Sequence, residues 1–189
     1  MDLNKGFDMS GYKKIVDAAD NIDEEDCPFN VSFSQKEFHE PQSGFATFDN
    51  NELNVKWIGP KNYWYIPAQV DAISYCVIDP RNKNKKLYVV SDNFSGCDFH
   101  VLGHSSGKLA FLHVYRNQGG AVSYTPKTGW YKKIMKYSKG LINTFGHSGN
   151  ILAFACIDAN QPRVNIETQF IHLDALAKIK STVDDGEKP

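Results

Sequence analysis

The chain has 189 residues, of which 41% are hydrophobic and 23% charged, and its formal net charge is −1. This length and balance suit one globular domain with a sizeable core. The near-neutral charge gives no overall field that would draw the chain to nucleic acid or to a membrane surface, and no apolar run reaches transmembrane length. We expect a single domain over residues 1–189, a monomer, that binds neither nucleic acid nor membrane.

The first half of the chain consists mainly of short apolar runs separated by turns. Residues 11–20 (GYKKIVDAAD) suit a short amphipathic helix, and an acidic loop follows it up to Pro28. Runs rich in β-branched and aromatic residues predict strands at 29–34, 44–49, 52–58, 71–79 and 86–91.

The second half begins with a predicted hairpin, in which 97–102 and 108–115 are strands around the turn GHSSG. Residues 128–141 (TGWYKKIMKYSKGL) suit a helix that stops near Gly140, 151–158 and 163–171 suit strands, and a short helix is expected near 173–181. The tail 182–189 is expected to be disordered. Because strands dominate without regular βαβ alternation, we expect an α+β domain with a β-sandwich-like core of mixed sheets and flanking helices.

The hairpin concentrates reactive side chains. Its stretch from Asn93 to Tyr115 holds one of the four cysteines and three of the six histidines. If the turn is centred on Ser105, Cys97 faces His113 across the two strands, on the same side as two apolar pairs. Directly opposite residues have Cβ atoms about 4.5–5.5 Å apart, which brings a sulfur within reach of an imidazole nitrogen.

A cysteine beside a histidine suits nucleophilic catalysis, because the thiolate is the nucleophile and the imidazole can take the thiol proton. Gly96 precedes the sulfur and permits a tight turn with close approach of a substrate. The backbone amides of Gly96 and Cys97 are candidates for an oxyanion hole.

Two other interpretations of Cys97 remain open. In the first, it is an unreactive core thiol, as free cysteines often are. In the second, it belongs to a zinc site with His100, His104 and His113. Against zinc, His100 points away from Cys97 on a strand and His104 lies in the turn. The other cysteines have no framework spacing: Cys76 and Cys156 lie in apolar strand-like runs and Cys27 in an acidic loop. We expect reduced thiols, which suit a reducing compartment or delivery into one.

The aromatic segment NYWYIP (62–67) has two possible roles. Its rings pack into the core, as large aromatic side chains often do, or Trp64 with its neighbours Tyr63 and Tyr65 is partly exposed and docks a target protein.

The motif Ser95-Gly96-Cys97, followed by a hairpin that ends in His113, resembles the SGC…His motif of bacterial glutamine deamidase toxins. These are the catalytic domain of cytotoxic necrotizing factor and the Burkholderia lethal factor. The resemblance covers roughly residues 88–115. Phe94 stands where the family has leucine. The family's cysteine and histidine correspond to Cys97 and His113, and a Ser/Thr position six residues before the cysteine corresponds to Ser91.

The resemblance implies conversion of a protein glutamine to glutamate. Cys97 attacks the carboxamide, His113 gives a proton to the leaving ammonia and then activates water, and Ser91 orients the imidazole. Asp92 and Asp98 are near in sequence, but Asp98 should face away from Cys97. No metal or organic cofactor is needed.

The implied partner is a host protein such as the translation-initiation helicase, the lethal factor's target, or a Rho-family GTPase, the target of the necrotizing factor. The N-terminus lacks the hydrophobic core of a signal peptide, so export, if it occurs, uses another route, with action in the host cytosol. The chemoreceptor deamidase CheD is an alternative, which would act in the bacterial cytoplasm, but its motif orders the residues Gly-Ser-Cys. A binding module without catalysis, with Cys97 buried, is an alternative of another class.

Overall fold

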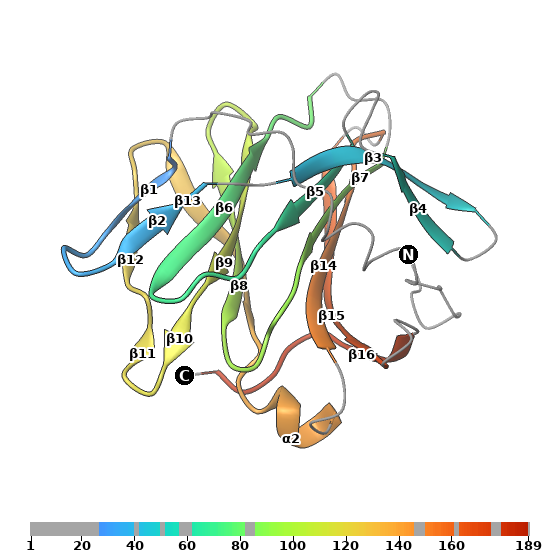
Figure 1. Ribbon diagram of the computed structural model, residues 1–189. Coiled ribbons are helices and arrows are strands. Elements are labelled where there is room, and N and C mark those ends of the chain that lie inside the picture. Colours follow the sequence, from blue (N-terminus) through green and yellow to red (C-terminus); the bar gives the residue numbers. More distant parts are fainter. Residues whose placement is uncertain are drawn as a thin grey trace.

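The protein is a sandwich of two β-sheets in the computed structural model, which describes residues 27–39, 42–49, 52–56, 62–81, 86–145, 150–160, 163–174 and 179–188 (Figure 1). The five-stranded sheet has the order β13-β8-β9-β6-β2, and the seven-stranded sheet has the order β16-β15-β14-β7-β5-β3-β4. Most neighbouring strands are antiparallel, but β2 with β6 and β5 with β7 are parallel. The expected sandwich of mixed sheets is therefore confirmed.

The strands of the five-stranded sheet are β2 (Lys36–Phe38), β6 (Ala72–Ile78), β8 (Asp98–His104), β9 (Leu109–Val114) and β13 (Trp130–Tyr137). Those of the seven-stranded sheet are β3 (Gln42–Asp49), β4 (Glu52–Lys56), β5 (Tyr63–Ile66), β7 (Lys86–Ser91), β14 (Asn150–Asp158), β15 (Asn165–Leu173) and β16 (Ile179–Val183). Two small ribbons pair β1 (Phe29–Val31) with β12 (Tyr124–Pro126) and β10 (Arg116–Asn117) with β11 (Gly120–Ala121). Among the described residues the helix is α2 (Leu141–Phe145).

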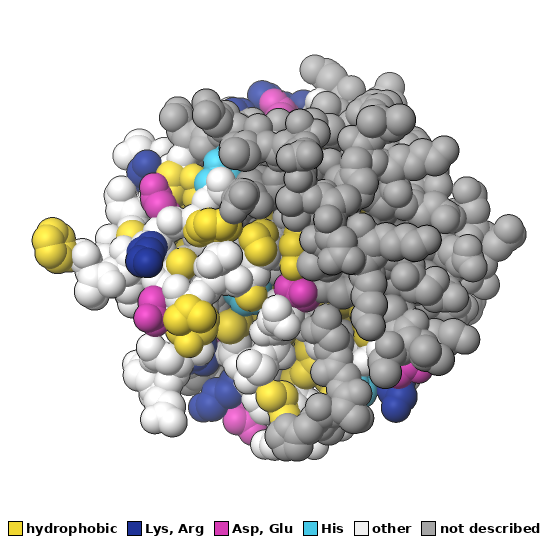
Figure 2. Space-filling model, viewed as in Figure 1, with side chains coloured by type: hydrophobic (Ala, Val, Ile, Leu, Met, Phe, Trp, Pro, Cys, Tyr) yellow, Lys and Arg dark blue, Asp and Glu magenta, His cyan; other side chains and the backbone are white. Residues whose placement is uncertain are grey.

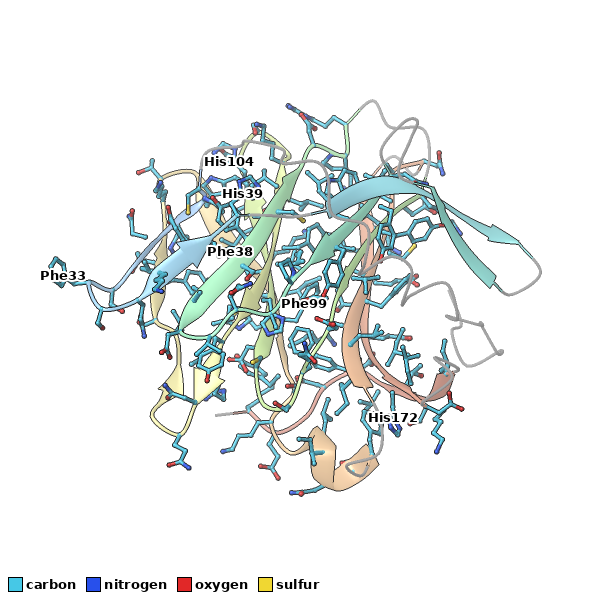
Figure 3. All side chains as sticks on the ribbon, in the orientation of Figure 1. Phe33, Phe38, His39, Phe99, His104 and His172 are labelled. Atoms are coloured by element: carbon cyan, nitrogen blue, oxygen red, sulfur yellow. The ribbon has the colours of Figure 1, made fainter. Side chains whose placement is uncertain are left out.

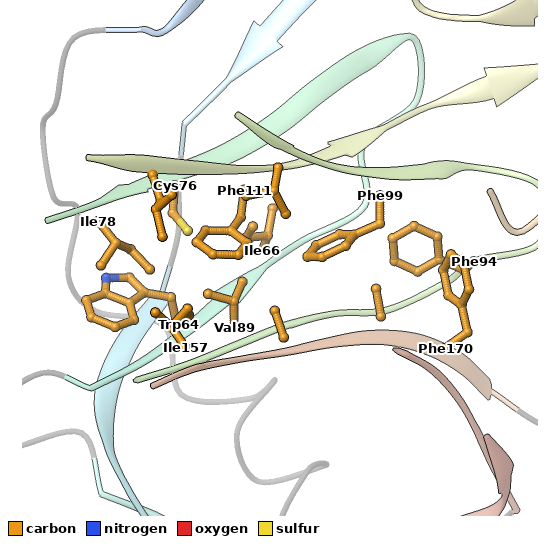
Figure 4. Close-up of a cluster of buried hydrophobic side chains, with 14 of the residues drawn as sticks. Trp64, Ile66, Cys76, Ile78, Val89, Phe94, Phe99, Phe111, Ile157 and Phe170 are labelled. Carbon is orange, nitrogen blue, oxygen red and sulfur yellow. The ribbon is translucent and has the colours of Figure 1, made fainter. Parts of the chain in front are cut away.

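The main core fills the space between the two sheets. It runs from Trp64 and Ile78 at one end to Phe94 and Phe170 at the other (Figure 4). Because side chains alternate along a strand, Cys97, immediately before β8, and Phe99 and Val101 of β8 face into this core.

A second core covers the outer face of the five-stranded sheet. Here Leu102, Leu112 and Val114 pack with Phe29 of β1 and Val122. The β1–β12 ribbon lies over this face (Figure 1). The strands β6, β8 and β9 are therefore buried on both faces, which explains why β6 and β9 are almost continuously apolar, whereas β8 also buries Asp98 and His100.

The expected helix at 128–141 is wrong, because Trp130–Tyr137 is an edge strand paired with β8. The pairing shifts between Lys132 and Ile134. This irregularity breaks the two-residue alternation, so the apolar residues take a spacing that imitates a helix. The lysines suit an edge strand, where charge discourages pairing with another chain.

Near the C-terminus, the helix expected at 173–181 is wrong for its last three residues, because they belong to the strand β16, which begins at Ile179. The tail, expected to be disordered, is bound in its described part. The N–H groups of Gly186 and Glu187 donate to the carbonyls of Tyr137 and Lys139, at 2.6 and 2.8 Å. The expected helix at 11–20 lies outside the described residues.

The described surface carries no segregated charge on the face seen in Figure 2, where acidic and basic side chains are interspersed. Phe33, in the turn between β1 and β2, is fully exposed and extends away from the body of the molecule (Figure 3). In the described part of the chain, no helix has the length and apolar character to cross a membrane.

Candidate active site

The β8–β9 hairpin has a register two residues away from the expected one. Phe99 pairs with His113 and Val101 with Phe111. The hairpin closes one step later than predicted, where the His104 N–H donates to the Lys108 carbonyl at 2.9 Å, and Gly107 takes a φ of +92° in the turn.

An even shift leaves every side chain on its expected face. Cys97 and His113 therefore both face the space between the sheets, as diagonal neighbours rather than as a direct pair. Diagonal positions have Cα atoms about 7–8 Å apart and remain within reach of an imidazole. The expected shared face is confirmed, and the expected direct pairing is wrong.

His113 is held from the opposite sheet by Ser91, the last residue of β7. The Ser91 Oγ lies 2.8 Å from His113 Nδ1 and 2.7 Å from the Ile66 carbonyl oxygen. The Ser91 hydroxyl donates its one hydrogen to the Ile66 carbonyl oxygen in a hydrogen bond. Its oxygen therefore accepts a hydrogen bond from His113 Nδ1–H. This arrangement leaves the lone pair on Nε2. The contact expected between Ser91 and His113 is confirmed.

The imidazole is a buried neutral base. Its ring stacks on Phe94, with centroids 4.2 Å apart, and its Nε2 is buried without a hydrogen-bond partner. Burial lowers the pKa of His113 to about 3, because the protonated ring loses its hydration. At neutral pH, Nε2 is therefore a proton acceptor.

Cys97 is a protonated thiol that is only 5% exposed. Burial raises its pKa, and the backbone N–H of Arg116 works against that rise by donating toward the sulfur. Since His113 Nε2 has no partner, the thiol and the imidazole are not hydrogen-bonded. The resting pair is thus neutral rather than a thiolate–imidazolium ion pair.

The turn before Cys97 is fastened by Ser138, which follows β13. The Gly96 N–H donates to Ser138 Oγ at 3.1 Å, and that hydroxyl donates to the Cys97 carbonyl at 2.7 Å. The expected role of the Gly96 amide in an oxyanion hole is corrected, since this N–H already has an acceptor. Gly96 itself suits the turn: its φ is +155°, and a Cβ there would meet nothing within 4 Å.

The aromatic segment lies in the core. Trp64, Tyr63 and Tyr65 form β5 with Ile66 and are all buried. Trp64 packs between the sheets, and the Tyr65 hydroxyl donates to Asp92 at 2.9 Å. Of the two expected roles, packing into the core is confirmed, and exposure of these rings for docking a target is wrong.

The zinc alternative is not supported by the positions of its four residues. Cys97 and His113 face the inner core, whereas His100 lies on the outer face, 2.9 Å from the Tyr124 hydroxyl. His104 is the last residue of β8, where its Nδ1 lies 2.7 Å from the Ser106 hydroxyl of the hairpin turn (Figure 3). Among the described residues, no three His, Cys, Asp or Glu side chains gather as metal ligands.

Asp98 and the other three cysteines make contacts that do not involve Cys97 or His113. Asp98 faces away from Cys97, as expected, and pairs with the Arg116 guanidinium at 2.8 Å. All four cysteines are thiols. Cys76 and Cys156 are buried in strands, and Cys27 donates to Glu37 at 2.8 Å.

Comparison of the chain with protein-family models, with curated proteins and with solved structures found no match. The likeness to deamidase toxins therefore rests on the short motif around Cys97 and His113.

Proposed function

We propose that the protein is a cysteine-dependent protein-glutamine deamidase. The observation that carries this proposal is the Ser91–His113 hydrogen bond, which orients a neutral imidazole on the inner face that also bears Cys97. Three residue types in this arrangement supply a nucleophile, its base and the group that orients the base.

Acylation begins when His113 Nε2 takes the proton of the Cys97 thiol and Sγ attacks the carboxamide carbon of a glutamine. An S–C bond forms and the C–N bond breaks. The nitrogen leaves as ammonia with the proton that Nε2 returns. The product is a thioester on Cys97, and hydrolysis of it releases glutamate and restores the thiol.

The Arg116 N–H is the best-placed donor near the sulfur. It already lowers the pKa of Cys97 against the effect of burial. In the reaction it would stabilise the thiolate, and the N–H of Cys97 remains a candidate for the oxyanion. Neither role requires a cofactor.

The substrate is proposed to be a host protein, either the translation-initiation helicase or a Rho-family GTPase, met in the host cytosol after non-classical secretion. A chemoreceptor in the bacterial cytoplasm is the alternative target, in the manner of CheD. Mass spectrometry of a treated host-cell lysate for new glutamates tests the reaction and identifies the target together.

A binding module with an inert core thiol is the competing function, and the burial of Cys97 favours it. Substitution separates the two. In the deamidase, Cys97→Ser lowers the rate at least about a thousandfold in a folded protein, because a serine hydroxyl is a far weaker nucleophile. His113→Ala is nearly as damaging.

The matched control is Cys156→Ser, which places the same change in another buried strand. It should lower stability and leave the deamidation rate of the folded protein intact. Near-normal activity in folded Cys97→Ser protein would contradict the mechanism. If a lysate treated with wild-type protein contains no glutamates that are absent from an untreated lysate, the proposed function is contradicted.

A further inference from the structure

Ser74 is a buried polar residue that the site as described does not use. It lies in β6, is 1% exposed, and its Oγ has no hydrogen-bond partner. Its neighbours Ile73 and Tyr75 pack in the outer core, whereas Cys76 packs between the sheets. By alternation, the Ser74 side chain faces the same inner space as Cys97 and His113.

Ser74 is also the direct partner of His113 in the β6–β9 pairing. Two buried polar atoms without partners, Ser74 Oγ and His113 Nε2, therefore come from side chains that are opposite each other on one face. Their Cβ atoms are about 4.5–5.5 Å apart by strand geometry, a separation at which one water molecule can bridge the two polar atoms.

Two chemical rules make this pair informative. Buried polar atoms in native proteins are almost always bonded to protein or to water, and a buried water needs two to four polar partners. A serine hydroxyl and an unprotonated imidazole nitrogen offer one donor–acceptor and one acceptor. The pair suits a water that must lose a proton to the imidazole.

We propose that Ser74 and His113 together bind the water that hydrolyses the thioester on Cys97, which makes Ser74 a positioning residue for deacylation. This inference rests on the proposed function. The water donates one hydrogen bond to Nε2 while its oxygen accepts one from Ser74 Oγ–H. As the oxygen attacks the acyl carbon, the proton moves to Nε2, the C–S bond breaks, and Nε2 returns the proton to the leaving sulfur.

Ser74 lies on β6, beyond β9 from β8, and its hydroxyl is not hydrogen-bonded to the Cys97 thiol, so the proton transfer that begins acylation does not involve it. The assignment therefore separates the two half-reactions. Loss of the hydroxyl should slow thioester hydrolysis and leave thioester formation unchanged.

The test uses 4-nitrophenyl acetate, which acylates a reactive cysteine and releases nitrophenolate without requiring the protein target. Ser74→Ala should keep the rate and amplitude of the nitrophenolate burst and slow the steady-state rate by about 10- to 100-fold, as misplacement of a reactant does. Acetyl-enzyme should accumulate in the intact mass spectrum, with the label on Cys97.

Hydroxylamine supplies a second readout, because a stronger nucleophile depends less on a positioned base. It should restore turnover of Ser74→Ala and yield acetohydroxamate. Cys76→Ala, on the same strand and inner face, is the matched control and should retain the wild-type ratio of burst to steady-state rate.

The outcomes separate the two proposals. A wild-type protein that shows no burst at Cys97, with Cys97→Ala as background, overturns the proposed nucleophile. A wild-type burst with an unchanged steady-state rate in Ser74→Ala overturns the assignment of Ser74 alone. Equal losses of burst and steady state, with a lowered melting temperature, also overturn it, because they show a structural role.

Discussion

At the scale of single residues, the site depends on one hydroxyl that fixes a tautomer. The Ser91 hydroxyl uses its one hydrogen to donate a hydrogen bond to the Ile66 carbonyl, so its oxygen accepts a hydrogen bond from His113 Nδ1–H. That choice places the lone pair of the imidazole on Nε2, where the proposed mechanism needs a base. A hydroxyl placed this way sets both the orientation of the ring and the nitrogen that carries the lone pair.

Ser91→Ala tests this control. It leaves two buried groups, His113 Nδ1–H and the Ile66 carbonyl, without their partner, and should lower the free energy of unfolding by about 1–3 kcal/mol. The kcat for deamidation should fall about 10- to 100-fold with little change in KM, because the misoriented base acts in both steps. Ser91→Thr, which retains the hydroxyl, should recover part of the kcat. An unchanged kcat in Ser91→Ala protein would contradict the role.

The sequence placed the proposed nucleophile, base and orienting hydroxyl together, because all three lie within one stretch of 23 residues, from Ser91 to His113. It did not locate Ser74 or Ser138. Ser138 follows Gly96 by 42 residues and meets it only because β13 pairs with β8. No local pattern marks a serine that a distant strand brings to a site.

At the scale of elements, the turn from Asn93 to Cys97 determines where the sulfur lies. The turn is tied to the seven-stranded sheet by the Phe94 N–H, which donates to Ile151 at 3.0 Å, and to β13 by Ser138. Asn93 has a φ of +59°, which is uncommon outside glycine. The turn therefore depends on its ties, and weakening one should expose the thiol.

Ser138→Ala removes the acceptor of the Gly96 N–H while the Ser138 backbone still donates to Cys97. It should cost about 1–3 kcal/mol of stability, and iodoacetamide should label Cys97 faster under native conditions. The control is Ser106→Ala, whose hydroxyl contacts His104 in the exposed turn at the other end of the hairpin. Unchanged labelling of Cys97 in Ser138→Ala protein would show that this tie does not limit access.

The C-terminal tail packs against the end of β13 and the residues that follow it, and Gly186 determines how closely the tail approaches them. A Cβ at this position would lie 2.5 Å from the Lys139 carbonyl oxygen and 2.8 Å from that of Tyr137. Since backbone atoms do not move aside cheaply, Gly186→Ala should release the tail. Hydrogen exchange of the Gly186-to-Glu187 amides should rise toward the unprotected rate, and Lys188→Ala, an exposed change beyond the contact, should leave it protected. Persistent protection in Gly186→Ala protein would rule out this account.

At the scale of the whole molecule, alternation and composition were sufficient to predict the sandwich, because β6, β7 and β9 are apolar runs bounded by turns. The same pattern failed for β13, where a bulge and edge lysines imitate a helix. The order in which the strands pair could not be predicted from local sequence patterns. The parallel contacts of β5 with β7 and of β2 with β6 join segments that nothing adjacent in the chain specifies.

The five-stranded sheet buries His100 on its outer face and His113 on its inner face, and the titration of these two rings should govern acid stability. Burial lowers the pKa of each to about 3, while an unfolded chain has histidine pKa values near 6.5. Between about pH 6.5 and 3 the unfolded state binds these protons and the folded state does not. Stability from this source is therefore complete above pH 6.5 and is lost as the pH falls toward 3.

Each histidine contributes a slope of at most about 1.4 kcal/mol per pH unit in this window. The raised pKa of Asp98, caused by burial, offsets part of the effect, because the folded state binds that proton more tightly. Urea unfolding at about pH 7, 5.5 and 4.5 measures the slope. His100→Gln retains a polar side chain opposite Tyr124 but cannot take up a proton, so its stability should fall less steeply than that of wild type, and His113→Gln should behave alike. A wild-type slope that neither substitution reduces would show that these two rings do not control the acid response.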